Sequence, residues 1–498
     1  SGAAIAGYRI ARTGLTVATI PFSQTSFQDT TASGSTEYTY AVSAFDQAGN
    51  VSAPASLNVT TAAPLANGEA AYCPSTVISS MSFQYSTMLS ETHSNLADNP
   101  PYSDGSDLWP VTWGQDGNVY TSFGDGWGLC GELDSGAGIT NDKTSFGVSK
   151  ITGGPPTGPL GQSCPSQFTN GNIYGGYNSS HPYNDNKNGL LNGKMSSIIA
   201  IGANFYGLGG VWRSTDQGGP YDSPNHYEVV SSPSNAYSWA DTAWNFCSAD
   251  SNGNPLSGGL GGRTGLCVNS FADFGAGIPS ADGYIYAYGV ANTSYFWNGY
   301  GSTTGANVTY LVRVPSSQIT TESAYQFYSG LDFNGNPIWT TNINQIRPVF
   351  VDNTPSQTYS GTNYTFPMLM NIGKPVYDAP LKRYIAVAEG AKESQVAFYE
   401  APNLWGPWSV IYYTNINVAN GGTGGWGNLG AGTWNGSTYV DMDTLGHNIV
   451  GAWTSADGKT LQIVFSSDGL APTNSSFSAL AGNNMDSFNL VEAILTTP

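Results

Sequence analysis

The sequence predicts an all-β chain whose larger part is a five-bladed β-propeller with long loops. Two observations carry this prediction. The 498 residues are rich in Gly (63), Tyr (30) and Trp (13) but only 10% are charged, a composition that favours strands and turns over helices. Five strand–turn–strand units also recur from about residue 109 onward. One hairpin per blade at long, irregular intervals is what a propeller with large insertions shows.

The five units share a first apolar strand, a polar turn and a second strand, which is the pattern of a β-hairpin. They span residues 109–123, 196–212, 274–289, 374–388 and 448–465. No stretch of the chain keeps a helical period over several turns. We therefore expect five blades built around these hairpins.

The charge balance excludes several classes of partner. The net charge is -19, from 34 acidic and 15 basic residues, and such a surface attracts neither nucleic acid nor an anionic membrane. It also disfavours a strongly anionic polysaccharide. No apolar run is long enough to cross a bilayer. We expect a secreted monomer that acts on a polysaccharide or oligosaccharide, with a chain that starts after a removed signal peptide or is a fragment.

The five cysteines predict disulfides rather than a zinc site, because their spacing fits no zinc motif. Cys247 and Cys267 bracket a Gly-rich insertion that a bridge would hold closed. Cys130 and Cys164 form a second plausible pair, which leaves Cys73 unpaired.

The N-terminal segment, residues 1–63, reads as a small separate unit of short strands. Its segments 7–10, 38–42 and 44–52 resemble the later part of a fibronectin type III domain. The first two strands of such a domain are missing, which implies a partial β-sandwich with an exposed core face. Such a module implies a spacer or an adhesive unit without chemistry of its own.

The rest of the chain divides into a linker and the main domain. Residues 64–79 are expected to form the linker, and residues 80–498 the propeller that carries the catalytic site.

An acidic residue flanks the first hairpin on each side. Asp107 precedes its first strand and Asp125 follows its second, so the fold of a hairpin brings both to the same end. Trp109 and Trp127 lie beside them, and flat aromatic faces suit sugar rings. Two carboxylates in such a setting can cleave a glycosidic bond. The alternative is structural, because Asp at strand ends also caps turns.

Several segments of the main domain resemble the endo-D-arabinanase family of glycoside hydrolases and, more distantly, the five-bladed arabinanases, β-xylosidases and invertases. The segments that carry this resemblance are residues 271–275, 282–288, 310–315, 325–331, 348–350, 400–408, 455–461 and 486–490.

This resemblance implies an active site at the mouth of the central channel, where the first strands of the blades converge. It also implies an acidic pair on the first blade, which Asp107 and Asp125 match by position. In the wider group the acid is a Glu from a middle blade. Glu228 and Glu389 are no clear counterparts, so the general acid stays open.

Further polar and aromatic residues are candidates for substrate binding. Lys194 and Arg213 flank the second hairpin, His226 follows it, and Trp426 lies in a Gly-rich loop. The plainer alternatives are solvated charges at strand ends and a structural imidazole. His447 opens the last blade, where the resemblance implies a central ion or water, so His447 is a candidate metal residue. No cofactor is required, and a structural calcium ion is compatible with the fold.

The function expected from the sequence is a secreted glycoside hydrolase that cleaves an arabinan or furanoside-type polysaccharide with two carboxylates. One alternative is a polysaccharide lyase acting on a uronate, with His226, Arg213 and Lys194 as its site. The other is a non-catalytic carbohydrate-binding or adhesion protein. The sugar, the linkage, endo or exo action and the stereochemical outcome are left open.

Overall fold

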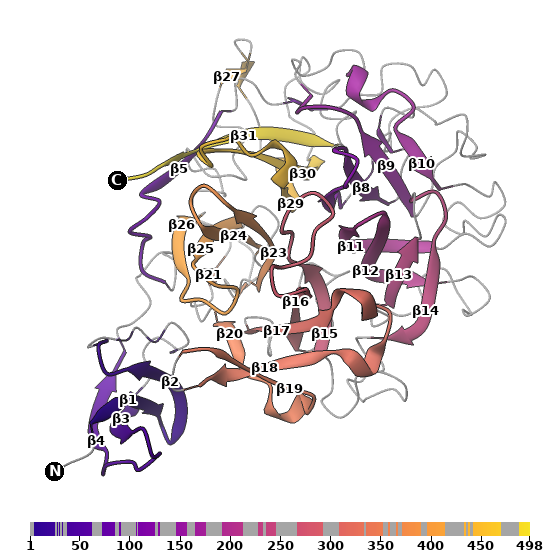
Figure 1. Ribbon diagram of the computed structural model, residues 1–498. Coiled ribbons are helices and arrows are strands. Elements are labelled where there is room, and N and C mark those ends of the chain that lie inside the picture. Colours follow the sequence, from indigo (N-terminus) through magenta and orange to yellow (C-terminus); the bar gives the residue numbers. More distant parts are fainter. Residues whose placement is uncertain are drawn as a thin grey trace.

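The computed structural model is all-β, apart from 3-10 turns of three residues each, and its strands form several antiparallel sheets (Figure 1). Among the described residues no helix is long and apolar enough to span a membrane. The structure describes residues 4–24, 27, 29, 32, 37–61, 72–84, 89–90, 106, 108–124, 128–129, 146–156, 165–175, 192–212, 228–232, 236–245, 266–291, 308–332, 335–351, 357–358, 365–366, 371–389, 396–413, 433–434, 437–438, 442–469 and 488–498.

The N-terminal segment forms one four-stranded antiparallel sheet in the order β2-β1-β3-β4. One face carries the small apolar cluster of Ile10, Ala18 and Ile20. Strand β4 is an edge strand, with no strand paired on its outer side among the described residues, and Leu57 on β4 is 67% exposed. The strands are β1 Ile5–Arg12, β2 Leu15–Pro21, β3 Glu37–Asp46 and β4 Ala55–Thr60.

Five further antiparallel sheets follow. Four of them begin with hairpins that overlap the units expected at 109–123, 196–212, 374–388 and 448–465, whereas the first strand of the third sheet ends at residue 271, before the expected unit 274–289. The first sheet consists of β7 Val111–Trp113, β8 Val119–Phe123, β9 Gly147–Ile151 and β10 Asn172–Tyr174, and the second of β11 Asn192–Ile201, β12 Asn204–Trp212, β13 Glu228–Ser232 and β14 Ala240–Asn245. The third sheet consists of β15 Leu266–Phe271, β16 Tyr284–Ala291, β17 Val308–Pro315, β18 Gln326–Leu331, β19 Pro337–Thr340 and β20 Pro348–Val351. The fourth consists of β23 Asn371–Asp378, β24 Arg383–Glu389, β25 Val396–Ala401 and β26 Ser409–Tyr413.

The fifth sheet joins strands from both ends of the main domain. Its members are β29 Met442–Ile449, β30 Thr460–Gly469, β31 Asn489–Thr496 and β5 Ser80–Phe83, with β6 Leu89–Ser90 also paired to β31. Strand β5 pairs antiparallel with β31, with Met81 opposite Leu495. The start and the end of the main domain are thus hydrogen-bonded to each other.

Three of the hairpin turns share an Asp-Gly pair whose chemistry explains the turn. Gly117, Gly283 and Gly458 have φ values of 82°, 82° and 74°, a region open to Gly without steric cost. The preceding Asp accepts a hydrogen bond from the backbone N–H two residues on in each turn. These side chains fix the turns and hence the register of the strands.

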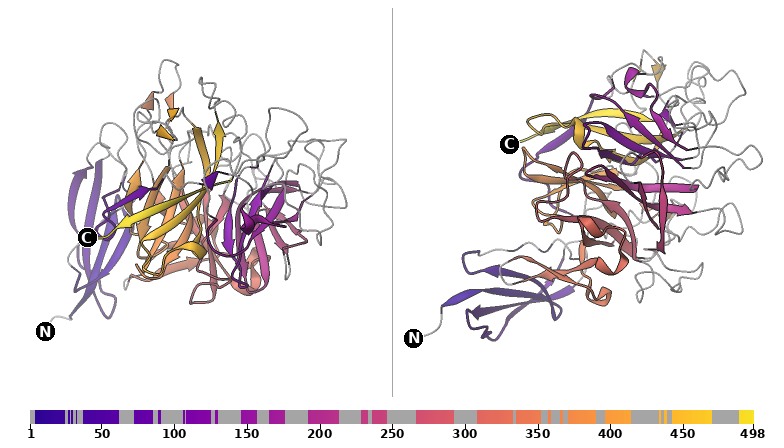
Figure 2. Two further views of the ribbon diagram at one scale, coloured as in Figure 1. Left: turned by 90° about the horizontal axis from the view of Figure 1, so that it is seen from above. Right: turned by 45° about the vertical axis from the view of Figure 1, so that its right-hand side comes forward.

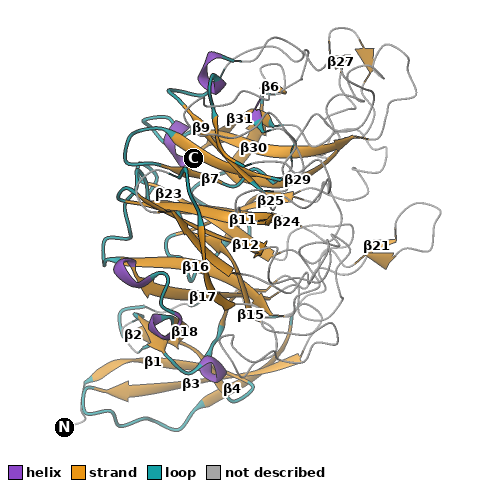
Figure 3. Ribbon diagram, turned by 90° about the vertical axis from the view of Figure 1, so that its right-hand side faces the viewer, coloured by secondary structure: helices purple, strands orange, loops and turns teal. Residues whose placement is uncertain are grey.

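The five sheets surround a common axis, and their first strands β7, β11, β15, β23 and β29 are the innermost (Figures 1 and 2). Apolar clusters fill the space between neighbouring sheets. The N-terminal sheet lies outside this arrangement, where β2 contacts β18 (Figure 3). The remaining elements are β21 Gln357–Thr358, β22 Thr365–Phe366, β27 Thr433–Trp434, β28 Ser437–Thr438 and the 3-10 turns η3 Ser166–Phe168, η5 Ser316–Gln318, η6 Glu322–Ala324, η7 Ile343–Gln345 and η8 Gly451–Trp453.

Candidate active site

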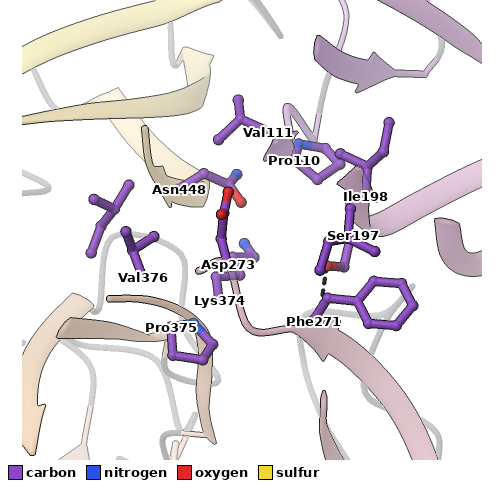
Figure 4. Close-up of a pocket in the computed structure, with 12 residues that line it drawn as sticks. Pro110, Val111, Ser197, Ile198, Phe271, Asp273, Lys374, Pro375, Val376 and Asn448 are labelled. Atoms are coloured by element: carbon purple, nitrogen blue, oxygen red, sulfur yellow. Dashed lines mark hydrogen bonds between the residues drawn. The ribbon is translucent and has the colours of Figure 1, made fainter. Parts of the chain in front are cut away.

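A small cavity lies on the axis, and all five sheets contribute to its wall (Figure 4). The first strands supply Val111, Ser197, Phe271, Val376 and Ile449. Its volume is about 20 Å³, which is enough for one water molecule but not for a sugar ring. Any substrate must therefore bind beside this cavity rather than inside it.

A ring of hydrogen bonds joins the first strands around the axis. Each bond pairs a backbone group of one segment with a side chain of its neighbour. The bonds run from Ala200 N–H to Thr112 Oγ1 (3.0 Å), from Phe271 N–H to Ser197 Oγ (2.9 Å), from Lys374 N–H to Ser270 Oγ, from Lys374 Nζ to the His447 carbonyl (3.1 Å), and from Asn448 Nδ2 to the Trp109 carbonyl (2.9 Å). This ring fixes the five innermost strands relative to one another.

Asp273 is the carboxylic acid that lines the cavity. It follows the end of β15, and its backbone is held on β23, since its N–H donates to the Pro375 carbonyl at 2.8 Å and its carbonyl accepts from Tyr377 N–H at 3.0 Å. Its Oδ1 accepts from Gly275 N–H at 2.8 Å. Figure 4 shows the carboxyl group extending toward the space between Asn448 and Pro110.

The pKa of Asp273 is raised to about 6. The cause is burial at the axis, where the residue keeps partial exposure, and backbone N–H groups of Gly275 and Trp113 oppose the shift. Burial disfavours the charged form of a carboxyl group. A carboxyl group with this pKa can hold or release a proton near neutral pH.

Lys374 has a backbone conformation that residues other than Gly rarely adopt. Its φ is 49°, and left-handed backbone in a residue with a Cβ costs on the order of 1 kcal/mol. Ser270 Oγ accepts the hydrogen bond from the backbone N–H of Lys374, and Lys374 Nζ donates to the carbonyl of His447 on the next sheet. The strain therefore serves to place the ammonium group across two first strands at the axis.

The connection between β15 and β16 closes one end of the axis. Gly277 N–H donates to the Trp113 carbonyl at 2.8 Å, and the Gly277 carbonyl accepts from Gly202 N–H at 2.7 Å. A Cβ on Gly277 would lie 3.0 Å from the Gln115 side chain, so only Gly fits without a shift. The described residues therefore cover the axis at this end, and the first strands begin at the opposite end.

The two flanks of the first hairpin meet at that opposite end. Gly128 N–H donates to Ser106 Oγ at 3.0 Å, and Leu108 N–H donates to Ser466 Oγ at 3.0 Å on the fifth sheet. Leu108 has a φ of 52°, a second strained backbone position beside the axis. Asp107 and Asp125 themselves lie outside the described residues, so their expected convergence stays a prediction.

The structure corrects the expectation that Trp109 contacts substrate. Its side chain is 0% exposed, and its ring packs against Phe123 at 5.8 Å and Phe488 at 5.2 Å between centroids. The aromatic ring belongs to the core between the first and fifth sheets, and only its carbonyl takes part in the ring of hydrogen bonds.

His447 is buried, and its ring stacks on Phe465 at 5.6 Å. The neighbouring Asn448, rather than His447, lines the cavity. Within the described part of the chain no three His, Cys, Asp or Glu side chains form a group that could hold a metal ion. The geometry gives His447 a place in the core, and the candidate metal role stays a prediction.

The other expected binding residues fall outside the description. Lys194 lies on β11, and its side chain is not among the described ones. Trp127, Arg213, His226 and Trp426 lie outside the described residues altogether. So do Cys130, Cys164 and Cys247, whereas Cys73 is exposed and free. The two disulfides stay predictions.

Asp116 in the turn of the first hairpin has several side-chain contacts. Its side chain is 40% exposed, but it accepts hydrogen bonds from Asn118 Nδ2 at 2.7 Å and from Tyr120 Oη at 2.8 Å. Burial raises the pKa of Asp116, but these hydrogen bonds outweigh burial and lower the pKa below its usual value. Asp116 thus anchors the turn of the first hairpin.

Comparisons with known proteins do not establish a function for this chain. No family model matches the chain, and no curated protein does. Several solved structures show a weak likeness: a GH43_1 enzyme from Xanthomonas citri (10% identity, 80% of this chain and 89% of that one, TM-score 0.33), a protein of unknown function from Dyadobacter fermentans (10%, 84% and 100%, 0.35), and a family 117 glycoside hydrolase from Zobellia galactanivorans (8%, 84% and 90%, 0.34). TM-scores below 0.5 carry no argument about activity.

Proposed function

We propose that the five sheets are the blades of a five-bladed β-propeller and that the chain is a glycoside hydrolase of the furanoside or arabinan type. The observation that supports this most is Asp273, a carboxyl group with a pKa of about 6 at the point where all five first strands converge. Glycosidic bond cleavage needs one protonated and one ionised carboxyl group. The N-terminal sheet we take as a fibronectin type III-like fragment, and a secreted monomer remains our expectation.

We assign the acid role, which the sequence left open, to Asp273. The cavity beside it admits one water molecule and no sugar, so the proton would pass to the glycosidic oxygen through that water. Asp107 and Asp125, which flank the first hairpin in the sequence, would supply the ionised carboxylate. That carboxylate takes the proton of the attacking water, or itself bonds to the anomeric carbon, as the C–O bond to the leaving group breaks.

Product analysis tests this proposal against its rivals. The purified chain is incubated with a panel of arabinans, xylans and uronate-containing polysaccharides, and both new reducing ends and ultraviolet absorbance are measured. A hydrolase releases reducing ends without absorbance. A lyase adds the absorbance of a new C=C bond, and a binding protein gives neither signal. Either of the last two results would overturn the proposal.

A further inference from the structure

A second cavity, larger than the first, lies between the N-terminal sheet and the main domain. Its volume is about 700 Å³, which is in the range of sites that hold small molecules and short oligomers. Strand β2 and the segment after it form one wall. Strand β18 and the loop that follows β25 form the other. We refer to this cavity as the interdomain groove.

Two parallel aromatic rings line the main-domain wall. Tyr328 and Trp405 have centroids 6.5 Å apart and an interplanar angle of 11°, so the two rings stack. Tyr328 is 6% exposed, and the partly exposed Trp405 is the ring that offers apolar surface to the groove. Phe27, which is 36% exposed, lines the opposite wall. Flat apolar faces opposite each other suit the C–H faces of sugar rings, and polar groups at the edge of the groove can bind the hydroxyl groups.

The charges of the groove favour a ligand with one acidic group. Arg347 lines the groove and is exposed; its backbone N–H donates to the Tyr328 carbonyl at 2.8 Å, but its guanidinium group has no hydrogen-bond or ion-pair partner among the described residues. The other guanidinium group, that of Arg12, is already paired with Asp29 at 2.9 Å. A guanidinium group binds a carboxylate with two parallel hydrogen bonds. A single available Arg on a chain of net charge -19 fits one carboxylate per bound segment and not a polyanion.

We propose that the interdomain groove is a non-catalytic binding site for a mostly neutral oligosaccharide that carries one uronate. The rings of Trp405 and Phe27 hold the neutral sugars, and the Arg347 guanidinium group binds the carboxylate. The site lies apart from the axis and does not depend on the hydrolase proposal. Ligand binding across the groove would also fix the N-terminal sheet against β18.

Calorimetry at about 0.15 M salt tests the site, with a xylo-oligosaccharide that carries one glucuronate and with the same oligosaccharide without it. Product analysis confirms that both stay intact during the titration, so the result is independent of turnover. We expect the acidic ligand to bind about tenfold more tightly. Arg347→Gln should remove this difference and leave the binding of the neutral ligand unchanged, and Trp405→Ala should weaken both by about tenfold or more.

Arg9→Gln is the matched control, because Arg9 is exposed on β1 and does not line the groove. It should change neither affinity. Phe27→Ala repeats the Trp405 test at an exposed position that folding tolerates. The proposal is overturned if wild type binds neither ligand at millimolar concentration, if Arg9→Gln acts like Arg347→Gln, or if Phe27→Ala binds both ligands as wild type does.

Discussion

The amide of Asn448 lies 2.9 Å from the carbonyl oxygen of Trp109, and both residues are buried. This contact joins the fifth sheet to the segment that leads into the first one. It closes the ring of hydrogen bonds around the axis, two residues after Asp107. The segment that directly follows Asp107 in the sequence is therefore held at Trp109 by a residue 339 positions further along the chain.

Replacing Asn448 by Ala should lower both stability and turnover. The substitution leaves the buried Trp109 carbonyl without its donor, which costs about 1–3 kcal/mol. Turnover should fall because the segment after Asp107 loses this contact at Trp109. Urea unfolding and kcat measure the two effects. Unchanged stability would mean that the contact does not close the ring.

Asp273→Asn should make the protein more stable and less active at neutral pH. The folded pKa of Asp273 is about 6 and its ordinary value is 3.8. Because the folded pKa is raised, the wild type loses stability as pH rises from about 4 to 6. The loss is at most about 3 kcal/mol above pH 6 and is smaller if water in the cavity hydrates the charge. Asn carries no charge and avoids the loss.

Urea unfolding of wild type and Asp273→Asn at about pH 3.5 and pH 7.5 measures this difference. The stability gain should appear at the higher pH only, together with a fall in kcat of about 10²–10⁴-fold for the loss of a general acid. A variant that is destabilised at both pH values would show that the carboxyl group is structural.

The hydrogen bond between Asp116 and Tyr120 should contribute to stability in a measurable, coupled way. A double-mutant cycle with Asp116→Ala and Tyr120→Phe should give a coupling free energy of about 1 kcal/mol. Asp282 and Tyr286 form the same bond, at 2.6 Å, in the third sheet and should give a similar value. Additive effects in both pairs would show that this hydrogen bond does not stabilise the turns.

Strand β5 should matter as much as any core strand, because it completes the fifth sheet. Met81 is 6% exposed and belongs to the core between the fourth and fifth sheets, so Met81→Ala should cost about 2–5 kcal/mol. Ser82 is exposed on the same strand, and Ser82→Ala should change stability by less than about 0.5 kcal/mol. Equal effects of the two substitutions would contradict this role of β5.

Four of the five hairpins, and the turn and second strand of the remaining one, could be predicted from the sequence because their signals are local. An Asp-Gly turn such as Asp116-Gly117 and the strands beside it lie within a few residues of one another. Asp273 could not be assigned, because its raised pKa comes from distant segments that bury it. Its one local sign is an acid directly after an apolar strand.

Trp109 shows the limit of composition as a guide. An aromatic residue beside an acid suits a sugar cleft and a core equally well, and only the packing of Phe488 against it decides for the core. The contact between Asn448 and Trp109 was likewise beyond sequence reasoning, because no pattern in a single chain pairs residues so far apart.

The central claim is that the carboxylates of Asp107 and Asp125 take part in the cleavage of a glycosidic bond. The turnover of three Asn variants tests this claim most directly. On a substrate found in the product screen, Asp107→Asn and Asp125→Asn should each lower kcat by about 10²–10⁴-fold with folding intact. Asp116→Asn, at the closed end, should keep kcat and lose only stability. Wild-type kcat in both Asp107→Asn and Asp125→Asn would contradict the account.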